Sequence, residues 1–278
     1  MRLAISHTTT YRFDDAPEYG LQQLRMTPKR SAGQKVVEWD MMIDGGVTQT
    51  VYTDHNNNRV TLVSFDTRAN TLAVQCKGIV ETVDANGVIG RHGGFAPLWY
   101  FQTPTDLTRI GTGVRRIVDK VNESASDEIS RFHALAETIL SEVTYKTDVT
   151  TTSTSAEEAI RQGSGVCQDH AHIFLAAARA MGRPARYVSG YLLIKDRVDQ
   201  YASHAWAEVH IDNLGWLGFD VSNGISPDDR YVRVATGLDY QDAAPVSGLR
   251  FGSGGEAMAI DIQVQQSRQP RHPAASRD

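Results

Sequence analysis

GSGVCQDH, residues 163–170, joins a glycine-rich turn to the start of an apolar segment. The pattern that follows predicts a helix from Cys167 to about Met181, with Gly182 as its stop. Backbone N–H groups in the first turn of a helix lack partners, and together with the helix dipole they stabilise a thiolate. The position therefore suits a nucleophilic cysteine, and it suits a small buried residue at a helix start equally well.

A second segment, SHAWAEVHI at residues 203–211, alternates with the period of a β-strand. The alternation places His204 and Trp206 on one face, whereas Ala205 and alternate residues after it form a face typical of a core. A histidine that opens such a strand can act as the general base for a cysteine. A purely structural histidine is the competing interpretation.

The hairpin that follows this strand determines whether Asp220 can reach His204. With an even loop, Asp220 pairs opposite Ala207 and points to the wrong face. With an odd loop, Asp220 lies opposite Trp206, which is diagonal to His204 and on the same face. Gly215 suits the left-handed position of an odd loop. A Cys–His–Asp triad therefore predicts an odd loop or a bulge at this hairpin.

Around these segments, the sequence predicts an α+β protein with two domains. Residues 1–90 alternate with period two between turn clusters, which is typical of an all-β, sandwich-like domain. After a junction rich in glycine and proline, helical periodicity and then strand-like runs indicate a second domain over residues 100–250. A further alternating segment predicts a C-terminal strand over residues 251–266, and the composition of residues 267–278 predicts a disordered tail.

Composition and charge limit the classes of function. The chain has 278 residues, of which 41% are hydrophobic and 22% charged, as is usual for a globular protein. Lysine and arginine number 28 against 33 aspartate and glutamate residues, which disfavours nucleic-acid binding. No apolar run is long enough to span a bilayer, and residues 1–13 do not resemble a secretion signal. We therefore expect a cytoplasmic protein without a nucleic-acid or membrane partner.

The two cysteines, Cys76 and Cys167, do not form a disulfide or zinc-binding pattern. Cys76 lies in an alternating strand, where we expect a small buried hydrophobe. A mononuclear metal site built from Cys167, His170 and His204 is an alternative, although His172 would project from another side of the helix. Because no oxygen-rich loop with calcium-site spacing is present either, we expect no metal and no cofactor.

Four segments in this order resemble the bacterial transglutaminase-like family: GVCQD at 165–169, ARYVSGY at 185–191, HAW at 204–206 and GWLGFD at 215–220. That family lies in the papain-like superfamily of transglutaminases and peptide N-glycanases, and its members are often described as cysteine proteases. The N-terminal strands also resemble the family's own N-terminal β domain. The resemblance therefore implies a papain-like α+β core behind a β domain, and it extends to about residue 250.

The resemblance implies amide chemistry at a Cys–His–Asp triad. Cys167 would be the nucleophile, His204 the base and Asp220 the residue that orients His204. A peptide or protein amide would form a thioester that water or another amine resolves, so hydrolysis and transamidation both stay open. The oxyanion hole would combine the Cys167 backbone N–H with a further donor, for which Gln162 and Tyr145 are candidates.

Other positions near the predicted site have two interpretations. Trp206 could form a wall of a substrate pocket or fill the core, and Asp169 could bind a substrate amine, although helix capping is favoured. The sequence departs from the family where His170 replaces an aromatic residue and where VSNG follows Asp220 in place of PTNG. Asn223 in that segment keeps a Cys–His–Asn arrangement open. A catalytically silent binding or scaffold protein is the alternative function, and a sandwich protein that assembles through its N-terminal domain is a third.

Overall fold

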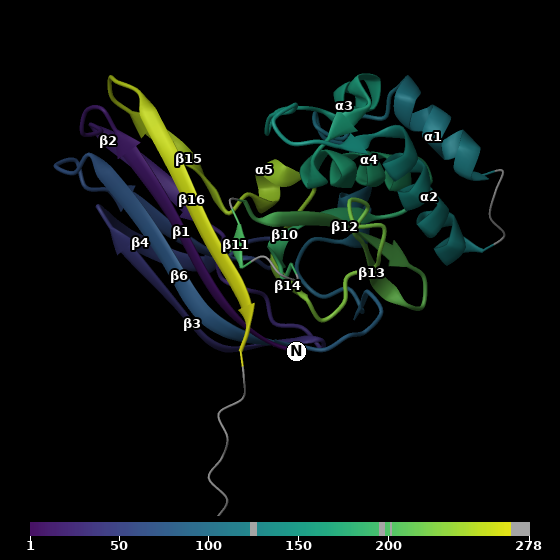
Figure 1. Cartoon of the computed structure of the whole chain (residues 1–278), viewed down its shortest axis with the longest axis horizontal. Helices are drawn as coiled ribbons and strands as arrows, with labels where there is room; N and C mark the ends of the chain where they lie inside the picture. The colour runs from purple at the N-terminus through teal and green to yellow at the C-terminus, as the bar shows by residue number, and fades with distance from the viewer. Residues whose placement is uncertain (123–126, 195–197, 201, 268–278) are drawn as a thin grey trace, which may run out of the picture.

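The structure, a computed structural model, describes residues 1–122, 127–194, 198–200 and 202–267. Figure 1 shows a β-sandwich beside an α+β core, with the helices α1 to α4 on one side of the core sheet. Apart from Ser267, the predicted tail lies outside the described residues. Within those residues, no helix has both the length and the apolar character needed to cross a membrane.

The sandwich contains two antiparallel sheets. The first has the order β11-β16-β1-β6-β3, with β1 Arg2–Phe13, β3 Gln34–Asp44, β6 Thr71–Thr82, β11 Asp199–Gln200 and β16 Glu256–Gln266. The second has the order β15-β2-β5-β4, with β2 Tyr19–Leu24, β4 Gly46–Thr53, β5 Arg59–Phe65 and β15 Val246–Phe251. Cys76 is buried between the sheets, as the alternation of its strand predicts, and burial together with the charge of Asp40 raises the pKa of its thiol to about 12.

The core is built on a five-stranded sheet. Its order is β14-β10-β12-β13-β7, with β7 Val88–Gly90, β10 Ala185–Leu192, β12 His204–Ile211, β13 Gly215–Phe219 and β14 Tyr231–Gly237. The helices are α1 Thr112–Asn122, α2 Glu128–Glu142, α3 Ala156–Gln162, α4 Cys167–Ala180 and α5 Tyr240–Ala243, with a 3₁₀ helix η1 Leu98–Gln102. A short parallel pair, β8 Thr144–Tyr145 and β9 Ser164–Gly165, precedes α4.

Helix α4 is the central helix of the core. It begins at Cys167 and ends before Gly182, whose φ of 77° is the left-handed conformation that glycine adopts without strain. Its buried alanines pack against the small side chains of Ala205 and Ala207 on β12. Small residues on both surfaces allow the helix to lie close to the sheet. This confirms the prediction that the alanine face of β12 lies in the core.

Strand pairing divides the chain differently from its composition. Strand β7, within the span 1–90, pairs with β13 of the core, whereas β15, most of which lies in the span 100–250, pairs with β2 of the sandwich. The predicted C-terminal strand is present as β16, and it belongs to the sandwich because it pairs with β1 along almost its whole length. Composition reveals turn-rich junctions but not pairing partners, which explains the difference. The chain therefore returns to the sandwich after completing the core.

Charged side chains lie on the face of the core sheet opposite the helices, where Gln34 of β3 reaches it from the sandwich. Glu208 is fully buried on this face and pairs with Arg186 at 2.7 Å and Arg233 at 2.6 Å. Burial would raise the pKa of Glu208, but the two arginines lower it. Gln34 of β3 reaches across to accept a hydrogen bond from the Arg233 backbone N–H at 2.7 Å. The polar face of β12 thus contributes Glu208 to a buried ion cluster at the domain junction.

Candidate active site

The segment before Cys167 is held rigidly by local hydrogen bonds. Helix α3 begins with a capping box of Ser155 and Glu158 and ends at Gly163, which has a φ of 67°. Strand β9 then pairs with β8, and α4 begins at the next turn. Cys167 is therefore the first helical residue, where its backbone N–H has no acceptor within the helix.

Asp169 fixes the start of α4. Its Oδ2 accepts hydrogen bonds from the Val166 backbone N–H and the Thr150 hydroxyl, both at 2.7 Å. A Cβ at Gly165 would lie 2.7 Å from the same Oδ2, so this close approach requires glycine. Asp169 is buried and caps the helix, which is the interpretation that its position favoured over binding of a substrate amine.

The hairpin between β12 and β13 has the odd register that a triad requires. Ala207 pairs with Phe219 and Ile211 with Gly215, which leaves residues 212–214 as the loop, and Gly215 has a φ of 93°. This confirms the predicted odd loop. Continuing the register places Asp220 on the face of His204, and His204 Nε2 lies 2.6 Å from Asp220 Oδ2.

The carboxylate of Asp220 is the centre of a hydrogen-bond network. Its Oδ2 accepts bonds from His204, from Asn223 Nδ2 at 2.7 Å and from the Tyr231 hydroxyl at 2.8 Å. Burial would raise the pKa of Asp220, but these bonds lower it. Burial would likewise lower the pKa of His204, but the bond to Asp220 and the neighbouring Cys167 raise it to about 10. The site therefore favours a protonated imidazole beside the sulfur of Cys167.

Asn223 supports the carboxylate more closely than it contacts the histidine. Its Nδ2 lies 3.5 Å from His204 Nε2, compared with 2.7 Å from Asp220 Oδ2. A tight turn brings it there, because Asp220 and Ile225 bond to each other through their backbones and Gly224 has a φ of 64°. The direct hydrogen bond to His204 is thus made by Asp220, and Asn223 donates a hydrogen bond to that carboxylate.

Tyr231 belongs to this network, although sequence reasoning did not identify it. It lies on β14, and no motif or spacing connects it to the histidine strand. Its ring packs edge-on against Trp206, with centroids 5.4 Å apart, and Trp206 in turn stacks at 6.2 Å on His204. The rings of Tyr231 and Trp206 therefore pack against the imidazole of His204, and the Tyr231 hydroxyl holds the carboxylate of Asp220.

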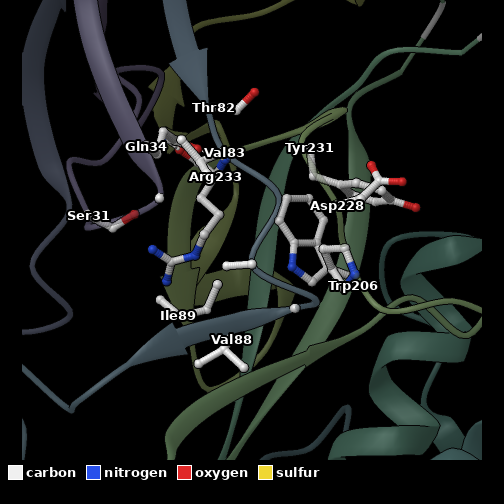
Figure 2. A pocket seen from close by; sticks show the side chains of 14 residues that line it. Ser31, Gln34, Thr82, Val83, Val88, Ile89, Trp206, Asp228, Tyr231 and Arg233 are labelled. Atoms are coloured by element: carbon white, nitrogen blue, oxygen red, sulfur yellow. Dashed lines mark hydrogen bonds between the residues drawn. The ribbon is translucent and has the colours of Figure 1, made fainter. Parts of the chain in front are cut away.

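Trp206 faces a small interdomain pocket of about 40 Å³ and does not line the pocket at Cys167 (Figure 2). The lining of the interdomain pocket includes Gln34, Thr82, Tyr231 and Arg233. Among the described residues, nothing accepts a hydrogen bond from the buried indole N–H of Trp206. The tryptophan is thus a wall of the domain junction and not of the candidate substrate site.

His170 is not available for the alternative metal site. Its Nδ1 accepts a hydrogen bond from the Ser222 hydroxyl, and its Nε2 donates one to the Val143 carbonyl, both at 2.8 Å. Burial lowers the pKa of His170, which fits a neutral imidazole. With both ring nitrogens bonded inside the protein, the residue joins α4 to its neighbours instead of sharing a ligand with Cys167.

Neither of the two candidate oxyanion donors is among the described residues that line the Cys167 pocket. Gln162 donates its side-chain amide to the Val149 carbonyl at 2.9 Å, at the exposed end of α3. Tyr145 is half-exposed, and its ring lies 6.1 Å from that of His170. Gln168, directly after the cysteine, lines the pocket and donates to the Thr152 carbonyl at 3.3 Å.

The Cys167 pocket has a volume of about 280 Å³ and lies between the core and the sandwich. It is lined by His7, Thr9, Tyr11, Thr152, Val166, Cys167, Gln168, Tyr187, Ala202, Ser203, Ala205, Tyr240, Pro245, Val246, Met258 and Ile260. Strands β1 and β16 thus contribute residues to the surroundings of the sulfur, which the sequence did not indicate.

Two family models match this chain. The model of the transglutaminase-like superfamily core matches residues 115–221, and the model of the bacterial transglutaminase-like N-terminal region matches residues 3–81. The chain carries a transglutaminase-like core. The core match includes Cys167, His204 and Asp220, and the N-terminal match covers most strands of the sandwich.

Uncharacterized mycobacterial proteins are similar to this chain over nearly its whole length. One from Mycobacterium leprae is 28% identical over 282 residues, covering 96% of this chain and 99% of that protein. One from Mycobacterium tuberculosis is 29% identical over 288 residues, covering 95% and 91%. A protein-glutamine gamma-glutamyltransferase of Pseudomonas aeruginosa is 33% identical over 107 residues, or 32% of this chain and 15% of that protein.

A solved structure shares the whole fold. The crystal structure of a "putative cysteine protease" from Cytophaga hutchinsonii aligns with a TM-score of 0.75 and 20% identity, covering 98% of this chain and 93% of that one. At this identity the likeness establishes the fold alone. The arrangement of a sandwich before a transglutaminase-like core is therefore shared with that protein.

Proposed function

We propose that the protein is a thiol-dependent enzyme that transfers the acyl group of a peptide or protein amide to water or to an amine. The observation that carries this proposal is the 2.6 Å bond between His204 and Asp220, next to a cysteine at the start of a helix. A buried carboxylate with three side-chain donors has a fixed orientation, and it fixes the histidine in turn. A binding or scaffold protein would not require this alignment.

In the proposed reaction, the thiolate of Cys167 attacks the amide carbonyl carbon and forms a C–S bond. The backbone N–H of Cys167 would donate to the oxygen that becomes negative. The imidazolium of His204 then gives its proton to the nitrogen as the C–N bond breaks, and the amine or ammonia leaves. Water or an amine next gives a proton to His204 and attacks the thioester, which releases the acyl product and restores the thiolate.

The carboxamide of glutamine is the first substrate to test, because the Pseudomonas aeruginosa relative is named a protein-glutamine gamma-glutamyltransferase. A library of glutamine-containing peptides would be incubated with the protein, with and without a primary amine, and ammonia release and amine incorporation would be measured. We expect turnover that Cys167→Ala abolishes and that the matched control Cys76→Ala retains. Turnover that survives Cys167→Ala would contradict the proposal, and an absence of turnover across glutamine and backbone amides would favour the binding protein.

A further inference from the structure

We propose that the Cys167 pocket binds an uncharged, apolar side chain of the substrate, and that the sandwich supplies one wall of this subsite. The inference rests on the proposed function, because it takes Cys167 as the atom that reacts with the substrate. It assigns the N-terminal domain a direct role in substrate selection.

The wall from the sandwich follows from the pairing of its two central strands. Tyr11 of β1 pairs with Met258 of β16, and Thr9 pairs with Ile260, so these four side chains share one face of the sheet. All four line the Cys167 pocket. Earlier on the same face of β1, Leu3 packs against the core sheet. The middle of the β1–β16 pair therefore faces Cys167, whereas the part of β1 near Leu3 contacts the core sheet.

The core supplies the opposite wall, and it is equally poor in charge. Tyr187, Ala205 and Tyr240 line that side next to Cys167. No aspartate, glutamate, lysine or arginine is among the described residues that line the pocket. A charged side chain would therefore lose its water there without gaining a partner, whereas an apolar one would gain from burial.

Among the described residues that line the pocket, the one histidine is His7, whose imidazole is neutral and already bonded. Burial lowers the pKa of His7 to about 4. Its Nδ1 lies 2.9 Å from the Tyr191 hydroxyl, and its Nε2 lies 3.1 Å from the Thr9 hydroxyl. His7 thus closes the pocket without presenting a charge at neutral pH.

The size of the pocket limits its occupant. Its volume of about 280 Å³ lies just under the range of roughly 300–1,000 Å³ that is usual for sites of drug-sized ligands. This suits one large side chain with its adjoining backbone, and not an extended ligand. Because Cys167 is among the residues that line the pocket, the occupant would be a substrate residue close to the amide that reacts.

The test compares three alkylating probes on the full-length protein. They are iodoacetamide, its N-phenylethyl derivative and a derivative with a trimethylammonium group of similar length, all of which place iodide as the leaving group at the same carbon. Rates at Cys167 would be measured by peptide mass spectrometry and divided by rates with glutathione. We expect the phenylethyl probe to exceed iodoacetamide by roughly tenfold or more, and the cationic probe to fall below it.

Two variants locate the preference. Met258 is 56% exposed, so Met258→Asp should fold normally, reduce the phenylethyl preference about tenfold and favour the cationic probe. Met258→Trp should fill the pocket and reduce the phenylethyl rate alone. Leu249→Asp is the control, because Leu249 is 50% exposed on β15 and outside the pocket lining.

The outcomes separate this inference from the proposed function. Equal normalised rates for the apolar and cationic probes, or a preference that Met258→Asp leaves unchanged, would overturn the apolar subsite. The plain iodoacetamide rate tests the nucleophile, so a slow rate with an intact preference would overturn the catalytic proposal and leave the subsite standing.

Discussion

Replacing Asp220 with asparagine keeps the shape of the side chain but removes the charge beside His204. The pKa of His204 is raised from 6.5 to about 10, and at about 1.4 kcal/mol per pH unit this is roughly 5 kcal/mol in favour of the imidazolium. Asp220 and Cys167 share that effect, so Asp220→Asn should remove about 2 kcal/mol of it. The histidine would then release its proton one to two pH units lower, as an order of magnitude, and the thiolate would lose its partner.

The pH profile of iodoacetamide alkylation at Cys167 measures this loss. In the wild-type protein, labelling should stay fast well below the pKa of about 8.5 of a free thiol. In Asp220→Asn, the alkaline inflection of the labelling profile, where His204 loses its proton, should move down by roughly one to two pH units, with little change at pH 6. Cys76, which is buried, is the internal control, and Asp66→Asn removes an exposed carboxylate that pairs with Arg68. An unchanged profile in Asp220→Asn would contradict the role given to Asp220.

Three further predictions test other parts of the account. Tyr231→Phe removes one of the donors that lower the pKa of Asp220, so the acidic limb of the alkylation profile should move to higher pH. Tyr100→Phe is the control, because Tyr100 bonds Asp242 outside the site, and it should leave the acidic limb in place. Gly165→Ala should lower the free energy of unfolding by about 1–3 kcal/mol and slow Cys167 labelling, because the new Cβ would meet Asp169. Thermal unfolding measures the loss, and Gly33→Ala is the control, because the nearest atom to its new Cβ is 3.5 Å away. Arg233→Met leaves the buried Glu208 with one arginine, so it should cost about 3–5 kcal/mol in urea unfolding, while Arg68→Met on the surface should leave the midpoint unchanged.

The pH dependence of stability follows from the same pair. The folded-state pKa of His204 is raised from 6.5 to about 10, so its contribution is fully present below pH 6.5 and is lost as the pH rises towards 10. Asp220 has a lowered pKa, so its contribution is present above its ordinary pKa and is lost on acidification. Urea unfolding of the wild-type protein between pH 6 and 10 should show the first decline, and Asp220→Asn should flatten it.

The local features of the site could be predicted from the sequence because neighbouring residues encode them. The glycines before Cys167 and the apolar run after it specify the turn and the helix. Gly215 signalled the odd loop that brings Asp220 to His204. Short-range turn chemistry and a period of two were sufficient for these features.

Features that depend on pairing between distant segments could not be predicted in this way. Tyr231 reaches Asp220 only because β14 joins the other side of β10, and nothing near either residue encodes that contact. Met258 reaches the pocket because β16 pairs with β1 from the opposite end of the chain. Gln162 was placed by its distance along the chain from Cys167, but its amide bonds to the Val149 carbonyl instead.

The central claim is that Cys167 forms a thioester with an amide substrate. The most direct measurement is mass spectrometry of the protein mixed with a glutamine-containing peptide and quenched in acid, followed by peptide mapping. We expect an adduct on Cys167 with the mass of the peptide less ammonia, which hydroxylamine removes and which His204→Ala reduces strongly. An adduct on another residue, or turnover of the peptide without any adduct on Cys167, would contradict it.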